Sequence, residues 1–299
     1  MKNKLLALLL SIIIVVIGTA NRTIHTKAAL TDVYYSSPGK VVYGNTEYAH
    51  AIFVDDYYCA LEEGKAFLYA TKCKGSTLTF PTTIAYNYKI YQTDGIYEFI
   101  GKDYPEDDDC YYWPGTEFKN KKKVKKIIVP EKVTGVRLFL STWKNVKEIR
   151  LPASVDYAIL GHTTAKIVIS KKNKYLKKYK NGIYTKKNQA LMSTCGNKST
   201  FTVKKGTKYL YPYAFYGYKK LKKVIVPSSV KRIYGLAFEN CKNLKTIVLE
   251  GKKAPKLTAG GFELLNKKCK IYVKNKKVKK SIEKQLKGSG FKGKVGVKK

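Results

Sequence analysis

A 23-residue internal repeat constrains the fold of this chain more than any other sequence feature. Residues 208–230 read KYLYPYAFYGYKKLKKVIVPSSV, and residues 231–253 read KRIYGLAFENCKNLKTIVLEGKK. Seven positions are identical, and in both copies a Phe precedes three aliphatic residues by six, nine and eleven positions. The same spacing starts at Phe118, at Leu140 and, in a degraded form, at Ala158. A period of about 20–50 residues predicts a stack of repeats rather than a single globular core.

Each repeat contains the pattern Leu-x-x-Val-x-Val, whose alternation is typical of a β-strand with one apolar face. Stacking such strands buries these faces in one continuous core. The pattern therefore predicts a mostly β, or α/β-type, solenoid with a parallel sheet on one wall. The pairs Ala214-Phe215 and Ala237-Phe238 are expected to fill the opposite wall. Near the C-terminus, Val278, Ile282 and Leu286 recur every four residues before Gly288 and predict a short capping helix.

The segments AFENCKNLKTIVL (237–249) and LKKVIVPSSVKRIYGLAF (221–238) resemble the BspA-type leucine-rich repeats of exported bacterial proteins. The resemblance covers roughly residues 60–290 and implies cell-surface binding or adhesion rather than catalysis. It names no ligand, because ligand choice in such arrays depends on variable positions. The lysine content, the irregular repeats at 157–204 and the acidic insertion near Pro105–Cys110 depart from the family pattern.

Three further segments resemble parts that flank or interrupt such arrays. KYLKKYKNGIYTKKNQALM (174–192) is similar to an inserted β-hairpin. CKIYVKNKKVKKSI (269–282) is similar to a closing segment, and GSTLTFPTTIAYNYKIYQ (75–92) to a first repeat.

The N-terminus is typical of a secretory signal peptide. Lys2 and Lys4 precede a run of apolar residues that ends at Ile17, and small residues follow. The run is shorter than the roughly 20 residues needed to span a bilayer. We therefore expect cleavage after Ala20 or Ala28 rather than an uncleaved anchor, no stable membrane span afterwards, and a secreted or cell-surface protein.

We expect four regions along the chain. They are a signal peptide (1–29), a tyrosine-rich acidic cap with the first repeat (30–115), the solenoid with a hairpin insertion near 174–200 (116–274), and a basic cap and tail (275–299). Net charge changes sign at the second boundary, from −7 over residues 31–115 to +41 over residues 116–299. No fold is assigned to residues 31–70.

Composition argues against an enzyme or a metal site. Three histidines, six cysteines and no C-x-x-C motif leave little material for either. A cysteine paired with His50 or His162 lacks any local signature of a protease. The acidic run Asp107–Asp109 admits either a calcium site or a solvated loop, and its spacing favours the loop. We predict no catalytic residue, no metal and no cofactor.

The exposed positions of the repeat strands carry the charge. The chain has 59 Lys+Arg against 21 Asp+Glu, a net charge of +38. The x residues of Leu-x-x-Val-x-Val point away from the core, and neighbouring strands lie about 4.8 Å apart. Lysines at that spacing lie within a Debye length of about 8 Å, so they repel one another and favour a bound polyanion. The candidate ligand-binding residues are Lys125, Lys126, Lys147, Lys166, Lys222, Lys223 and Lys245. The alternative is a solvated face.

An exported protein with this face would meet an anionic cell-wall polymer such as teichoic acid, an acidic glycan or a host surface protein. Nucleic acid is disfavoured because only four cations are arginine, the residue suited to bidentate phosphate recognition. We expect a monomer. A structural wall protein held by charge, and a hydrolase in the N-terminal region, are the alternative functions.

Two further residue types admit two interpretations each. Tyr209, Tyr211, Tyr213, Tyr216 and Tyr218 either stack on sugars or pack between repeats, and packing is favoured. Cys59 and Cys73 are the candidates for a disulfide, whereas Cys241 is expected to be a buried small hydrophobe.

Overall fold

The computed structural model describes residues 41–43, 46–48, 50–54, 57–71, 73–86, 89–98, 118–258, 262, 265 and 267–298. The chain divides into two compact units. The first comprises residues up to 73 together with 81–120, and the second comprises 74–80 together with 121–299. The expected signal peptide and the acidic run Asp107–Asp109 lie outside the described residues.

The first unit is built on a mixed sheet. Antiparallel pairing joins β3 to β4, β4 to β5 and β7 to β8, whereas β5 and β8 run parallel. Cys59, Leu61, Leu68 and Ile96 are buried in it. A separate antiparallel pair is formed by β1 and β2. The strands are β1 (Val41–Tyr43), β2 (Thr46–Tyr48), β3 (His50–Val54), β4 (Tyr57–Glu62), β5 (Lys65–Thr71), β7 (Thr83–Tyr86) and β8 (Lys89–Tyr97).

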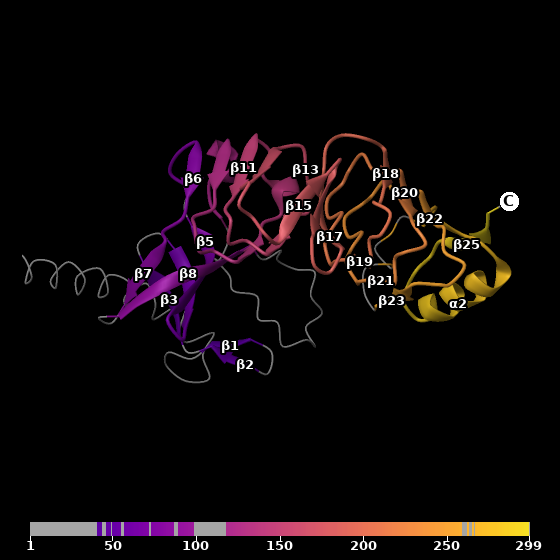
Figure 1. Ribbon diagram of the computed structural model, residues 1–299, viewed down its shortest axis with the longest axis horizontal. Coiled ribbons are helices and arrows are strands. Elements are labelled where there is room, and N and C mark those ends of the chain that lie inside the picture. The colour runs from indigo at the N-terminus through magenta and orange to yellow at the C-terminus, as the bar shows by residue number, and fades with distance from the viewer. Residues whose placement is uncertain are drawn as a thin grey trace, which may run out of the picture. The chain divides into compact units, whose positions relative to one another are not determined.

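The second unit is a solenoid whose main wall consists of parallel strands (Figure 1). One sheet contains β6 (Thr77–Thr79), β9 (Lys126–Ile128), β11 (Glu148–Leu151) and β14 (Lys166–Ile169). The other contains β18 (Thr200–Thr202), β20 (Lys223–Val226), β22 (Thr246–Leu249), β24 (Lys270–Val273) and β25 (Lys294–Val297). The registers Ile149↔Ile167 and Val224↔Ile247 are those that the repeat spacing predicts. The expected parallel sheet is confirmed.

Short strands also line the opposite wall, for which the repeat pattern predicts only the Ala-Phe pairs. In Figure 1, β17, β19, β21 and β23 run along the side of the solenoid away from β18, β20 and β22. Their hydrogen bonds link successive repeats, for example from the Tyr234 amide to the Leu210 carbonyl (3.0 Å). These strands are β10 (Gly135–Arg137), β12 (Tyr157–Ile159), β13 (His162–Thr163), β17 (Ala190–Cys195), β19 (Tyr209–Leu210), β21 (Arg232–Ile233) and β23 (Lys256–Leu257). Two 3-10 turns, η1 (Lys121–Lys123) and η2 (Leu140–Thr142), lie between strands.

The predicted hairpin insertion is confirmed as the antiparallel pair β15 (Leu176–Tyr179) and β16 (Gly182–Thr185). The buried Asn173 side chain fixes its start. Its amide donates to the carbonyls of Pro152 and Val155, both at 2.8 Å, and its carbonyl oxygen accepts from the amides of Tyr175 and Leu176. Because all of these groups are paired, the buried amide stabilises the junction instead of destabilising it.

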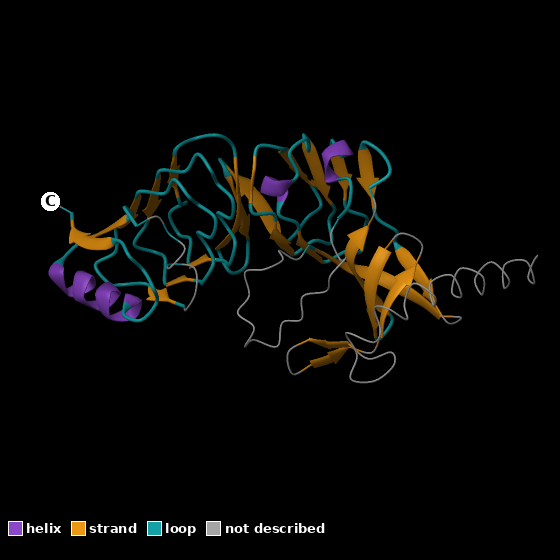
Figure 2. Ribbon diagram, turned by 180° about the vertical axis from the view of Figure 1, so that it is seen from behind, coloured by secondary structure: helices purple, strands orange, loops and turns teal. Residues whose placement is uncertain are grey.

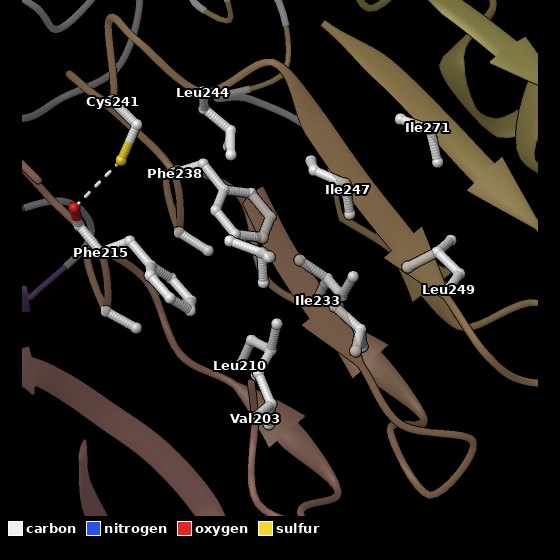
Figure 3. Packing of buried hydrophobic residues seen from close by; sticks show 14 of the residues in the cluster. Val203, Leu210, Phe215, Ile233, Phe238, Cys241, Leu244, Ile247, Leu249 and Ile271 are labelled. Atoms are coloured by element: carbon white, nitrogen blue, oxygen red, sulfur yellow. Dashed lines mark hydrogen bonds between the residues drawn. The ribbon is translucent and has the colours of Figure 1, made fainter. Parts of the chain in front are cut away.

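A ladder of phenylalanines fills the core between the two walls (Figure 3). Phe215 and Phe238 stack at a centroid distance of 5.0 Å, and Phe201 meets Phe215 at 5.1 Å. Ala214 and Ala237 are fully buried beside them, as predicted. The Cys241 thiol donates to the Phe215 carbonyl (3.1 Å) and is 1% exposed, which confirms it as a buried small residue.

The predicted C-terminal helix is α2 (Lys276–Leu286), and it covers the last repeats (Figure 2). Val278, Ile282 and Leu286 are its buried residues. The Asn275 side chain accepts a hydrogen bond from the Val278 amide (2.9 Å), and Gly288 has a φ of +82° just beyond the helix. This is the arrangement that N-caps and glycine C-caps favour. No helix among the described residues is long and apolar enough to cross a membrane.

Candidate functional site

All seven candidate lysines lie on the outer side of the main wall. Each directly follows or precedes a buried aliphatic residue, such as Leu221 or Ile127. Six are exposed, and Lys126 is half-buried. Backbone hydrogen bonds connect them in steps, from the Lys147 amide to the Lys125 carbonyl (2.7 Å) and from Lys245 to Lys222 (2.9 Å). The lysines therefore stack across strands as the repeat alignment requires.

The lysines do not form one continuous column. Lys125, Lys126, Lys147 and Lys166 belong to the sheet of β6, β9, β11 and β14, whereas Lys222, Lys223 and Lys245 belong to the sheet that begins at β18. Between the two sheets, the chain forms the hairpin β15–β16 and strand β17 of the opposite wall. The seven candidate lysines thus fall into two groups, one on each sheet.

Glu148 compensates the first group. Its register places it between Lys126 and Lys166, and its carboxylate lies 3.8 and 3.9 Å from their ammonium groups. The Arg150 guanidinium donates to the same carboxylate at 2.7 Å. This hydrogen bond and the three positive charges hold the pKa of Glu148 below its usual value, although partial desolvation opposes them. A polyanion approaching this sheet would compete with an internal carboxylate.

The second sheet carries a row of lysines with no acidic residue in its own strands. Lys223, Thr246, Lys270 and Lys294 are paired in register on neighbouring strands. No acidic residue occurs within strands β18, β20, β22, β24 and β25. Lys270 and Lys294 are not among the lysines that the repeat alignment predicts. The segments KIYV of β24 and KVGV of β25 repeat the lysine–aliphatic–x–aliphatic order of KVIV at β20. That order is the sequence signal that could have identified both lysines.

The tyrosines of the repeat divide between two environments. Tyr213, Tyr216 and Tyr218 are at most 6% exposed, so packing is confirmed for these three. Tyr209 and Tyr211 are half-buried and alternate with the buried Leu210 in and after β19, so they point outward. Burial and the neighbouring phenols of Tyr234 and Tyr209 raise the pKa of Tyr211. The Tyr211 side chain thus keeps a neutral hydroxyl group at physiological pH.

His162 is a packing residue. Its ring stacks on Tyr218 at a centroid distance of 3.4 Å, and its Nδ1 lies 3.3 Å from the Thr194 hydroxyl. Burial lowers the pKa of His162 to about 4, against a smaller opposing effect of a hydrogen bond to the Gly196 backbone. A neutral imidazole with these partners is not arranged to activate a thiol.

The described cysteines are buried. Burial raises the pKa of both Cys241 and Cys269 to about 12, which disfavours the reactive thiolate. Cys59 and Cys73 have thiol side chains in the structure, and a disulfide between them stays a prediction. Among the described residues, no three His, Cys, Asp or Glu side chains gather as a metal-ligand set.

Comparison with known proteins identifies the repeat. The family described as "BspA type Leucine rich repeat region" matches residues 185–285 with six copies. No curated protein matches the chain.

Several solved structures are similar to the chain. The pneumococcal vaccine antigen PcpA is 12% identical, covers 86% of this chain and all of its own, and has a TM-score of 0.28. A leucine-rich cell-surface protein from Faecalibacterium prausnitzii is 12% identical, with coverages of 82% and 94% and a TM-score of 0.34. A leucine-rich repeat protein from Eubacterium ventriosum is 14% identical, with coverages of 82% and 83% and a TM-score of 0.35.

Proposed function

The chain carries BspA-type leucine-rich repeats over residues 185–285, and from this premise we propose that it is an exported cell-surface binding or adhesion protein that holds an anionic polymer. The proposed ligand is a teichoic acid or an acidic glycan. The observation that carries the proposal is the row Lys223–Lys270–Lys294, which no acidic side chain of its own strands compensates. The apolar start of the sequence supports export.

The row suits a polymer because its three charges are spread along neighbouring strands, with Thr246 between Lys223 and Lys270. Adjacent strands lie about 4.8 Å apart, so Lys270 and Lys294 lie one strand spacing apart and Lys223 lies two spacings from Lys270. Three lysines at this spacing raise the local concentration of a polyanion without selecting a particular headgroup. Lys222 and Lys245 extend the basic surface beside the row. Binding is thus expected to depend on charge spacing and salt rather than on one fitted pocket.

Changing Lys223, Lys270 and Lys294 together to Gln is expected to weaken binding to purified teichoic acid at least about tenfold, since each lysine near an anionic surface contributes roughly 1 kcal/mol. The measurement is calorimetric titration of the secreted form at low and high salt. The matched control changes Lys171, Lys172 and Lys187, three exposed lysines outside the row, and removes the same net charge. An equal loss of affinity in the control would show that net charge alone causes the effect. If neither variant loses affinity, the row is a solvated face and not a binding site.

Glu148→Gln is expected to strengthen the same binding several-fold, most clearly at low salt, because it frees Lys126, Lys166 and Arg150 from their internal carboxylate. Glu131→Gln removes an equal charge from an exposed turn and serves as the control. If Glu148→Gln leaves the affinity unchanged while the triple lysine variant loses affinity, the ligand binds only the second sheet.

A further inference from the structure

A strip of tyrosines lies on the wall opposite the lysine row. Tyr211 lies 6.4 Å from Tyr157 and 5.3 Å from Tyr234 between ring centroids, and Tyr209 lies 6.5 Å from Tyr234. All four rings are half-buried. Tyr209, Tyr211 and Tyr234 alternate with Leu210 and Ile233, which are at most 1% exposed. The core therefore holds the backbone while the rings face outward.

The repeat makes the strip regular. Tyr211 and Tyr234 occupy equivalent positions of the two 23-residue copies, and parallel pairing of β19 with β21 places them one strand apart. Arg232, on the same side of β21, lies over the Tyr234 ring at 5.4 Å and donates to its hydroxyl at 3.5 Å. This contact fixes the ring of Tyr234 and engages the guanidinium within the protein. The strip thus presents phenol rings that are tilted by 53–62° to their neighbours, with hydroxyl groups that can donate and accept hydrogen bonds.

We propose that the strip Tyr157–Tyr209–Tyr211–Tyr234 is a second binding face, which takes a neutral linear saccharide by stacking its sugar rings on the tyrosines. A periodic row of amphipathic rings matches a polymer whose rings carry C–H faces and hydroxyl edges. A cation beside an aromatic strip, such as Arg232, would also suit the acidic surface of a protein partner. The area of the strip argues against a protein partner. Four half-buried tyrosines offer on the order of 400 Å² together, whereas a stable protein partner needs roughly 800 Å² on each side.

Tyrosine pairs across strands also stabilise a sheet by themselves. The two roles differ in what a substitution changes. If the strip served packing alone, its loss would lower stability and leave saccharide titrations flat. If it binds saccharide, removal of the rings abolishes binding in a protein that remains folded.

The test titrates the full secreted chain with chitohexaose, cellohexaose and mannohexaose. At least one is expected to bind, and Tyr211→Ala with Tyr234→Ala should weaken that binding at least about tenfold, with little change at high salt. Tyr211→Phe with Tyr234→Phe keeps the stacking surface and should retain most of the affinity. Tyr272→Ala removes a half-buried tyrosine from β24 on the lysine-bearing wall and is the matched control.

Two outcomes would overturn the assignment. One is the absence of binding by all three hexasaccharides to the unaltered protein. The other is an equal loss in Tyr272→Ala, with circular dichroism showing all variants folded. The triple Lys223, Lys270 and Lys294 variant should bind saccharide normally, so the lysine row and the tyrosine strip can fail separately.

Discussion

Phe215→Ala is expected to lower the free energy of unfolding of the solenoid by about 3–5 kcal/mol, the range typical of a fully buried phenylalanine. Phe215 is 0% exposed and lies between Phe201 and Phe238, 5.1 and 5.0 Å away between ring centroids. Its removal leaves a cavity at the contact between two repeats. Since a solenoid is stable only through contacts between neighbouring repeats, the loss also uncouples the repeats on either side.

Urea unfolding of the full chain, followed by circular dichroism, measures this loss. Phe291→Ala is the matched control, because Phe291 is only partly buried at the edge of the same cluster, and it should cost about 1 kcal/mol. Phe215→Leu, which fills part of the cavity, should cost less than Phe215→Ala. A cost below 1 kcal/mol for Phe215→Ala would contradict the phenylalanine ladder as the core of the repeat.

The main wall of the solenoid could be predicted from sequence because its information is local and periodic. The aliphatic residues that lie six, nine and eleven positions after each Phe or its equivalent fix the register of the strands. Ile149 accordingly pairs with Ile127 and Ile167. The short strands of the opposite wall could not be predicted in this way. Tyr209–Leu210 and Arg232–Ile233 span two residues each, which is too short to show alternation. They form because stacking of the repeats brings their backbones within hydrogen-bonding distance.

The candidate site could be predicted from the sequence less completely than the main wall. Repeat alignment placed each lysine outward but could not show that the chain leaves the first sheet after Ile169 and starts a new one at Thr200. Glu148 was visible between Lys126 and Lys166 in the alignment. The contribution of Arg150 could not be seen in the alignment. It arises because Arg150, the next outward residue of the same strand, folds back and donates to the Glu148 carboxylate.

The tyrosines illustrate the same limit. Sequence alone cannot separate Tyr211 from Tyr218, because both lie in a tyrosine-rich turn of one repeat. Tyr218 enters the core, stacks on His162 and donates to the Lys198 carbonyl at 2.7 Å, whereas Tyr211 faces outward. Side-chain direction here follows from two-residue strands that only the stacked fold defines.

Acidification from pH 6.5 to pH 4 is expected to cost the solenoid about 3 kcal/mol of stability through His162 alone. Burial against Tyr218 lowers the folded-state pKa of His162 to about 4, against 6.5 in the unfolded chain. Between these values the unfolded chain binds the extra proton, so stability falls as pH falls. Above pH 6.5 this contribution is fully present, and below pH 4 the loss is complete, since each unit of pKa shift corresponds to about 1.4 kcal/mol.

His162→Phe isolates this contribution, because phenylalanine keeps a flat ring on Tyr218 and does not titrate. Its absolute stability is expected to differ from that of the parent, since the Thr194 hydroxyl loses its partner Nδ1. The informative quantity is the difference between the two slopes of stability against pH, taken from urea unfolding at closely spaced pH values between 4 and 7.5. Carboxylates elsewhere titrate equally in both proteins and cancel in that difference. Parallel curves across this window would show that His162 is not held neutral by its stack on Tyr218.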